Sequence, residues 1–289
     1  MENSVNINWF PGHMAKAKRQ MQESLKMVDM IIEIRDARIP YASANPLIEQ
    51  LINQKPRLVV LSKKDKADPA ETDKWIKALS KEETMVIAID SLHERVANDI
   101  VSAGKELMKA KIERMIRKGM KPRPIRAMVV GIPNVGKSTL INKIANKKVA
   151  ETADRPGVTK SLQWIKLNKD MELLDTPGVL WPKFEDKKVA MLLALTGAIR
   201  DQILNMEDIA AFGMSEMMKH HPELLKEHYG IELCDDPYEN LMNVGRARGL
   251  LKKENEVDFT RTVEYFVNEL RDDKCGRITW EYAEEMYQQ

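Results

Sequence analysis

The chain has 289 residues, of which 43% are hydrophobic and 31% charged, and its formal net charge is +2. No apolar run approaches the ~18 residues of a membrane-spanning helix, so we expect no segment that spans a membrane, and the N-terminal residues show no apolar core of a signal peptide. We therefore expect a cytoplasmic protein, with one domain of about 190–200 residues and a smaller one. Cys234 and Cys275 have no metal-ligand spacing and suit a reducing compartment.

Short apolar runs rich in β-branched residues alternate with segments of helical composition. They occupy residues 28–34, 57–61, 84–89 and 125–131. This alternation is typical of a parallel sheet covered by helices. Two further runs, at residues 161–167 and 171–175, would complete a sheet of about six strands.

The second of these runs leads into Ser62-Lys63-Lys64-Asp65. This sequence resembles the loop, usually Asn-Lys-x-Asp, with which GTP-binding proteins recognise guanine. The Asp65 carboxylate can accept hydrogen bonds from guanine N1–H and the exocyclic amine, while the Lys63 stem packs along the base. Ser62 replaces the usual Asn, so we expect the loss of a side chain that braces the phosphate loop.

The fourth run leads into GIPNVGKS, residues 131–138, which satisfies the pattern G-x-x-x-x-G-K-S and precedes a helical segment. Backbone N–H groups of such a loop surround phosphate oxygens. Lys137 is expected to reach the β- and γ-phosphates, and Ser138 to ligate Mg²⁺. The nucleotide-binding residues predicted in this loop are Asn134, Val135, Gly136, Lys137, Ser138 and Thr139.

The run at residues 171–175 leads into Asp175-Thr-Pro-Gly178. We predict that Asp175 lies on the Mg²⁺ side of the site and that the Gly178 N–H senses the γ-phosphate. Thr159, in an Arg-Pro-Gly-Val-Thr segment, is the predicted switch threonine that completes Mg²⁺ coordination, with Thr152 as the competing candidate.

The loops come in an unusual order, because ordinary GTPases have the phosphate loop before the guanine loop. A parallel sheet gathers such loops at the carboxyl ends of its strands, whatever their order in the chain, provided that the connections reach. We therefore predict an α/β fold, a circularly permuted P-loop GTPase domain with a mostly parallel six-stranded sheet and helices on both faces.

Five stretches in this order carry a family resemblance: WFPGHMAKA (9–17), DARIP (36–40), SKKD (62–65), GIPNVGKST (131–139) and DTPG (175–178). They resemble the circularly permuted bacterial ribosome-assembly GTPases. The resemblance implies a GTP-hydrolysing switch, dependent on Mg²⁺ and stimulated by the ribosomal particle, that binds rRNA and promotes late assembly of the large (50S) subunit. The implied partners are a 50S precursor, 23S rRNA and ribosomal proteins, with no membrane.

The hydrolytic water needs an orienting group. Ras-like enzymes use a Gln just after the DxxG motif, but here Val179 and Leu180 follow Gly178. The resemblance points instead to His13, whose neutral imidazole can position a water. The alternative is that His13 is a surface residue or an RNA contact beside Lys16, Lys18 and Arg19.

The resemblance also assigns residues to the rim of the site. A second base-contacting loop, Ser-Ala-Lys in most GTPases, is reduced here to Ile89-Asp90-Ser91, from which Asp90 and Ser91 are carried over. Asn134 is expected either to ligate K⁺ or only to brace the phosphate loop. Asp36 is expected to end its strand with a local bond to the backbone and has no catalytic role.

The region after residue 178 contains no convincing strand and predicts a small all-helical domain. We place the permuted G domain, with its His-containing N-terminal segment, at residues 1–195, and a helical RNA-binding domain at residues 196–289. Basic and acidic residues number 35 and 24 in residues 1–196 but 11 and 20 in residues 197–289. The acidic C-terminal part still holds a basic cluster, formed by Arg246, Arg248, Lys252 and Lys253, with Arg261 and Arg277 as further candidates.

Two basic regions are therefore candidates for RNA phosphates, together with the N-terminal residues Lys16, Lys18 and Arg19. The first is this C-terminal cluster, for which a solvated helix end is the alternative. The second is the segment 105–126, with nine basic and two acidic residues, for which a solvated linker or helix face is the alternative.

Overall fold

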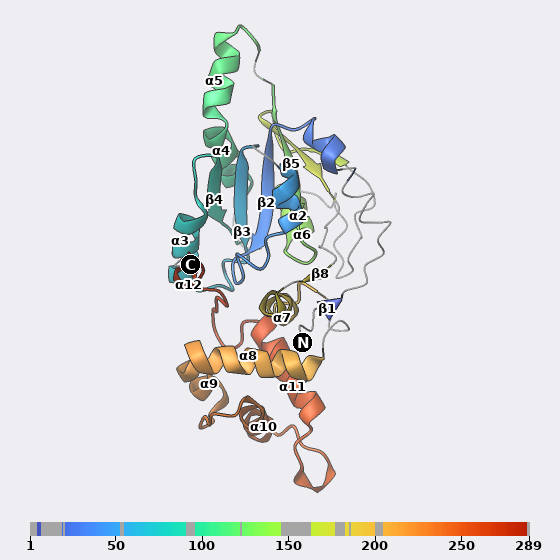
Figure 1. The fold of residues 1–289 in the computed structure, drawn as a ribbon, viewed down its shortest axis with the longest axis vertical. Helices are drawn as coiled ribbons and strands as arrows, with labels where there is room; N and C mark the ends of the chain where they lie inside the picture. Colours follow the sequence, from blue (N-terminus) through green and yellow to red (C-terminus); the bar gives the residue numbers. More distant parts are fainter. Residues whose placement is uncertain are drawn as a thin grey trace.

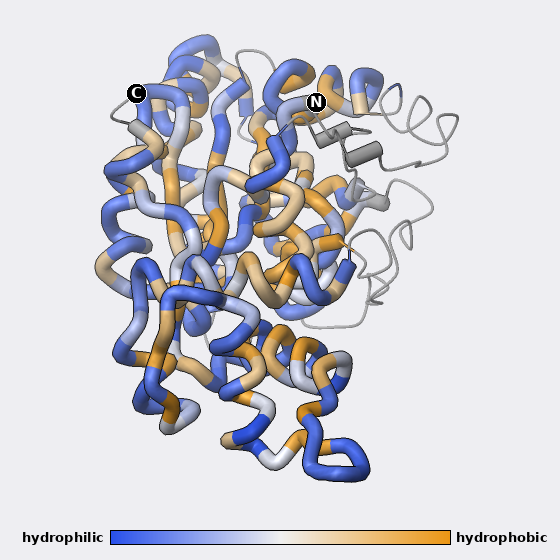
Figure 2. The backbone as a smooth tube through the Cα atoms, turned by 60° about the horizontal axis from the view of Figure 1, so that its bottom comes forward, coloured by the Kyte–Doolittle hydropathy of each residue, from blue (hydrophilic) through white to orange (hydrophobic). Residues whose placement is uncertain are grey.

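The computed structural model describes residues 5–6, 19, 21–52, 55–90, 96–121, 123–145, 163–176, 183–184, 186–199 and 205–287. An α/β part and a helical part lie one below the other in Figure 1. Hydrophobic residues run through the interior of both parts, and many outer turns are hydrophilic (Figure 2).

Six strands form the main sheet, in the order β4-β3-β2-β5-β7-β6. All neighbouring pairs are parallel except β6 and β7, which are antiparallel. The sheet confirms the predicted mostly parallel fold. The strands are β2 (Met30–Asp36), β3 (Arg57–Ser62), β4 (Thr84–Ala88), β5 (Ile125–Gly131), β6 (Gln163–Lys166) and β7 (Met171–Asp175).

The central strands are buried on both faces, which explains why their sequences read as continuous apolar runs. All seven residues of β2 are buried. One face packs on α4 (Val96–Leu107) and α6 (Lys137–Ile144) through a cluster that includes Ile32, Ile100 and Ile141. The other face packs on α2 (Pro46–Ile52) and the helical segment 21–25. Helices thus cover both faces, as expected.

The helices of the α/β part are α2 (Pro46–Ile52), α3 (Pro69–Leu79), α4 (Val96–Leu107), α5 (Lys109–Arg117) and α6 (Lys137–Ile144). Helix α5 has no buried residue, and it projects beyond the sheet at the end of the molecule away from the helical part (Figure 1). Its base is tied to the amino-terminal edge of the sheet, because Arg123 and Lys111 both pair with Asp29, just before β2.

The helical part contains α7 (Lys187–Leu195), α8 (Met206–His220), α9 (Pro222–Tyr229), α10 (Pro237–Ala247), α11 (Phe259–Arg271) and the short 3₁₀ helix η2 (Lys253–Asn255). Asn205, Asp236 and Asp258 cap α8, α10 and α11, each accepting a hydrogen bond from a first-turn N–H. None of the helices among the described residues is long and apolar enough to cross a membrane.

Helices on each side of the predicted domain boundary at residue 195 pack against elements on the other side. Helix α7, placed by sequence in the G domain, packs on α8 and α11. Helix α12 (Ala283–Tyr287) returns from the helical part to α3. One buried hydrophobic cluster is continuous from the sheet into α8 and α11.

A second, two-stranded sheet was not expected, because no strand was predicted after residue 178. Strand β1 (Val5–Asn6) pairs antiparallel with β8 (Lys183–Phe184). Two residues per strand are too few to show a hydrophobic alternation that sequence reasoning could detect.

Candidate nucleotide-binding site

The predicted nucleotide loops meet at one edge of the sheet. The guanine loop follows β3, the phosphate loop follows β5, and Asp175 ends β7. Since β3, β2, β5 and β7 are consecutive neighbours, these three loops share the carboxyl-terminal edge, where parallel sheets bind ligands. This edge faces the turn that follows α7, because Asn134 and Arg38 donate hydrogen bonds to Gly197 and Thr196 carbonyls.

The phosphate loop folds as its glycine pattern predicts. Gly136 has a φ of 93°, in the left-handed region that favours glycine, and α6 begins at the next residue. No side chain among the described residues caps α6, which leaves its first N–H groups available to phosphate oxygens. Val135 is buried and fixes the loop to the core.

Lys137 and Asp175 form an ion pair at the centre of the site. Lys137 Nζ lies 2.5 Å from Asp175 Oδ1, and the two side chains are only 6% and 3% exposed. Thr176 donates to the Val129 carbonyl and ties the loop after Asp175 to β5. The two groups predicted to serve a phosphate and Mg²⁺ therefore lie together and compensate each other's buried charge.

The expected loss of a brace at Ser62 is wrong. Ser62 is fully buried, and its hydroxyl lies 2.6 Å from the Val135 carbonyl oxygen, to which it donates. The Arg35 carbonyl lies 3.0 Å from the same hydroxyl. A serine is long enough here because the guanine and phosphate loops approach closely, so the two loops remain joined without an Asn.

Lys63 makes a second connection between these loops. Its backbone has a φ of 57°, and its ammonium nitrogen lies 2.9 Å from Asp36 Oδ2 and 3.1 Å from the Asn134 carbonyl. Burial lowers the pKa of Lys63, although Asp36 partly offsets this effect. The lysine stem is thereby held beside the phosphate loop.

Asp36 is the shared partner of two cations. Arg38 binds both its carboxylate oxygens, at 3.1 and 2.9 Å, and Lys63 binds one of them. Burial opposes ionisation, but Arg38 and Lys63 outweigh it and hold the pKa of Asp36 well below its ordinary range. The expected local bond also exists, since the Arg38 N–H donates to Asp36.

The wider network around Asp36 was not predicted from the sequence. A signal was present in the sequence, because an Asp and an Arg that follow a buried central strand need partners.

Asp65 and Asp90 lie on neighbouring loops. Lys64 N–H donates to the Ile89 carbonyl at 3.2 Å, and Ile89 N–H donates to the Leu61 carbonyl at 2.8 Å. These bonds bring the loop that carries Asp65 beside the one that carries Asp90, which is buried. The predicted base-contacting residues are thus adjacent as far as the described chain extends.

Asn134 uses its side chain within the protein. Its amide nitrogen donates to the Gly197 carbonyl at 3.2 Å, and its φ is 56°. This contact engages only the amide nitrogen, so bracing and K⁺ ligation both stay predictions for Asn134. It also links the phosphate loop to the chain that follows α7.

Several predicted residues lie outside the described part of the chain. They are His13, Lys16, Lys18, Ser91, Thr159 with its competitor Thr152, and Gly178. Arg19 is described, and it is exposed and paired with Glu23.

The C-terminal basic cluster is exposed but partly engaged. Arg246 pairs with Glu239 at 2.9 Å, and Arg248 stacks over Tyr229 and donates to the His228 carbonyl. Lys252 and Lys253, at the start of η2, are exposed. Arg277 does not join this cluster, because its guanidinium binds carbonyls of the guanine loop.

Comparison with known proteins agrees with this arrangement. Residues 126–234 match the family model described as 50S ribosome-binding GTPase. Ribosome biogenesis GTPase A of Bacillus cereus is 51% identical over 98% of this chain and 96% of that protein. The Thermotoga maritima protein of the same name is 31% identical over 97% of this chain and 96% of that protein.

Solved structures agree in fold. A GNP-bound YlqF from T. maritima has a TM-score of 0.62 at 30% identity, covering 93% of this chain and 99% of that chain. A GDP-bound YlqF has a TM-score of 0.64 at 29% identity, covering 92% and 100%. The chain therefore belongs to the ribosome biogenesis GTPase A family and is a GTPase with a circularly permuted guanine-nucleotide domain.

Proposed function

We propose that this protein is a GTP-hydrolysing switch that binds rRNA and promotes late assembly of the large (50S) ribosomal subunit, with a 50S precursor, 23S rRNA and ribosomal proteins as its partners. The observation that carries the proposal is the meeting of the guanine loop, the phosphate loop and Asp175 at one sheet edge in a chain of this family. Since bacterial ribosomes are assembled in the cytoplasm, the protein would work there.

The residues present fit a nucleotide with Mg²⁺. Hydroxyl and carboxylate oxygens suit this hard cation, and Ser138, Thr159 and Asp175 would supply them, directly or through water. The bound ion would neutralise charge on the phosphates. Lys137 would leave Asp175 for the β- and γ-phosphates, Asp65 would select guanine, and the Gly178 N–H would sense the γ-phosphate.

His13 would orient the attacking water. Val179 and Leu180 cannot hydrogen-bond to water, so another residue has to perform this step. A K⁺ ion held by the side-chain oxygen of Asn134 would add positive charge near the phosphates, and the Asn134 amide nitrogen could keep its bond to the Gly197 carbonyl. Turnover in KCl and NaCl at equal ionic strength tests this ion, because a bracing Asn134 predicts equal rates.

Helix α5 offers the strongest support for RNA binding. Between Lys109 and Arg123 the chain has seven basic residues and one acidic residue, on an exposed projecting helix and its connector. Lys105, Lys109 and Arg123 also line a pocket of about 320 Å³ at the foot of this helix. Such a surface attracts a polyanion electrostatically. Arg246, Arg248, Lys252 and Lys253 would provide a second contact, joined by Lys16, Lys18 and Arg19.

A second candidate is a GTP-gated RNA-binding module in which hydrolysis is incidental. The replacement of the usual glutamine by Val179 and Leu180 favours it. The two candidates differ in what the ribosomal particle does to the rate of hydrolysis.

Single-turnover GTP hydrolysis with and without purified 50S precursors separates these candidates. The proposed switch requires a large stimulation by precursors and none by mature 30S subunits, which serve as the control. Co-sedimentation should be stronger with a non-hydrolysable GTP analogue than with GDP. Equal rates with and without precursors would favour the binding module. Equal co-sedimentation in both nucleotide states would contradict the proposed switch.

A further inference from the structure

A segment from the far end of the chain runs along the guanine loop. Residues 273–281, here called the C-terminal strap, connect α11 to α12 and contact residues 64–68 and 38–42. The contacts join positions more than 200 residues apart in sequence. No motif in the sequence suggested them.

Arg277 makes the most direct contact with the guanine loop. Its Nη2 donates to the Lys64 carbonyl at 2.7 Å and its Nε donates to the Ala67 carbonyl at 3.0 Å. Asp65 lies between these two residues in the chain. One guanidinium therefore fixes the loop on both sides of the carboxylate that would read the base.

Further bonds hold the strap parallel to this loop. Ile278 N–H donates to the Lys66 carbonyl at 3.0 Å, and the Asp68 N–H donates to Thr279 Oγ1 at 3.0 Å. Lys66 Nζ lies 2.7 Å from Asp273 Oδ2 and 3.0 Å from the Arg271 carbonyl.

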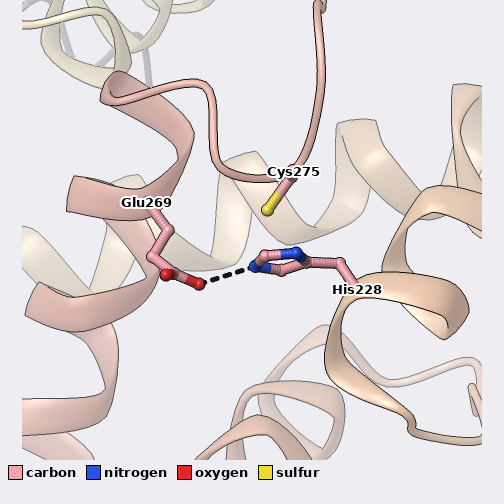
Figure 3. Close-up of side chains that lie close together, drawn as sticks. All are labelled: His228, Glu269 and Cys275. Atoms are coloured by element: carbon pink, nitrogen blue, oxygen red, sulfur yellow. Dashed lines mark hydrogen bonds and ion pairs between the residues drawn. The ribbon is translucent and has the colours of Figure 1, made fainter.

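The upstream end of the strap is anchored in the helical part. Cys275 is buried, and its sulfur lies 3.3 Å from the Tyr229 hydroxyl. Beside it, His228 Nε2 lies 2.9 Å from Glu269 Oε2, which closes a polar cluster between α9 and α11 (Figure 3). Gly276 then turns the chain with a φ of 105°, which L side chains rarely adopt. We assign this cluster a structural role.

The downstream end is anchored on the α/β part. Trp280 N–H donates to the Arg38 carbonyl at 2.8 Å. The buried Glu281 carboxylate accepts hydrogen bonds from the Tyr41 and Ala42 N–H groups, and its carbonyl accepts one from Trp75 Nε1.

We propose that Arg277 is a positioning residue for guanine recognition, and that the strap makes the placement of Asp65 depend on the helical part of the protein. The proposal rests on the proposed role of Asp65 as the base-reading residue. Its physical basis is that both ends of the strap are anchored by buried groups, while Arg277 spans the loop between them.

The test compares Arg277→Ala with Lys274→Ala in the full-length protein. Both changes remove one positive charge from an exposed side chain of the strap, but no described side-chain bond involves Lys274. Affinities for GDP and for IDP are measured by calorimetry. IDP lacks the exocyclic amine, so the GDP-to-IDP affinity ratio reports how well Asp65 is placed.

We expect Arg277→Ala to weaken GDP binding about tenfold, the equivalent of one charge-assisted hydrogen bond, and to bring the GDP-to-IDP ratio close to one. Lys274→Ala should keep both wild-type values. A general loss of stability would lower both affinities together and leave the ratio unchanged. An unchanged ratio in Arg277→Ala would therefore overturn the inference.

The wild-type protein separates this failure from failure of the proposed function. If it binds GDP no better than ADP, the guanine site itself is absent. If it prefers GDP and Arg277→Ala keeps the full GDP-to-IDP ratio, only the role of the strap is wrong.

Discussion

A single hydroxyl can join two loops in place of a longer side chain when the loops lie close together. Ser62 reaches the Val135 carbonyl because β3 and β5 flank β2 and their loops converge above it. Its residue type suggested a weakened site, whereas its position in the fold retains the link. Sequence reasoning could name the residue but not the distance that decides its effect.

Removing this hydroxyl should weaken nucleotide binding. Ser62→Ala leaves the Val135 carbonyl without its donor, which costs about 1–3 kcal/mol and should reduce GDP affinity about tenfold. Ser80→Ala is a matched control, since its exposed hydroxyl also donates to a carbonyl, that of Ile76, far from the site. Calorimetric GDP titration is the measurement, and equal affinities for the two variants would contradict the bracing role.

The Lys137–Asp175 pair makes a prediction for the nucleotide-free protein. Lys137→Ala leaves a buried carboxylate without its counter-charge, which should cost about 3–5 kcal/mol of unfolding free energy. Adding Asp175→Asn removes that charge and should recover much of the loss. Urea unfolding of both variants without nucleotide tests this. A double variant as unstable as the single one would show that the pair is not the cause.

The main elements were largely readable from the sequence. The six strands of the main sheet were found within two residues of their ends, because buried parallel strands flanked by helices give continuous apolar runs. The phosphate loop followed from its glycines. The two-residue strands β1 and β8 carried no detectable pattern.

Contacts between elements that lie far apart in the chain could not be predicted from the sequence. Helix α7 packs with α8 and α11, and the C-terminal strap bonds to the guanine loop, although each lies far in sequence from some of its partners. The role of a basic residue is ambiguous in the sequence for the same reason. Arg277 looks like a surface cation in the sequence, whereas the fold gives it two carbonyl acceptors.

Helix α5 should bind RNA through charge. Replacing Arg114, Arg117 and Lys118 by Ala should weaken binding to rRNA and make the dependence of log affinity on log salt shallower by about 2–3, because fewer phosphates are neutralised. Replacing Lys77, Lys81 and Lys226 by Ala is the charge-matched control. Filter binding across a salt series measures both, and identical slopes for the two triple variants would exclude α5 from the interface.

At the scale of the whole molecule, Glu281 ties the C-terminus to the loop after β2. Burial raises the pKa of Glu281 to about 7, despite N–H donors from Tyr41 and Ala42. Lys188 and Arg35 are the cations that act on it. Because the pKa is higher in the folded protein than in the unfolded chain, the folded state gains a proton between these two values.

The stability that this proton contributes is complete below about pH 4.5 and is lost as the pH rises through about 7. Glu281→Gln resembles the protonated acid and should remove this component, about 3 kcal/mol in all, from the pH dependence of unfolding. Glu284→Gln, at an exposed position, is the control. The measurement is urea unfolding at pH 5 and pH 8. A wild-type pH dependence of the unfolding free energy in Glu281→Gln would contradict the assignment of this component to Glu281.

The permuted order of the nucleotide loops determines how they are connected to the helical part. The segment after β7, which would contain the γ-phosphate sensor, continues through β8 to α7 and the helical part, and the strap returns from that part to the guanine loop. Both ends of a bound nucleotide would therefore be connected to the same helical body. A change in that body on a ribosomal particle would reach the base and the phosphates together.

The proposed function requires residues 65 and 137 to hold opposite ends of one guanine nucleotide. The most direct test is calorimetric titration of Asp65→Asn with GDP and XDP, because Asn complements the xanthine edge and not the guanine edge. We predict that GDP affinity falls about a hundredfold or more while XDP binds tightly. Undiminished GDP affinity in Asp65→Asn, with XDP still rejected, would contradict the proposal that residue 65 holds the guanine end of this nucleotide.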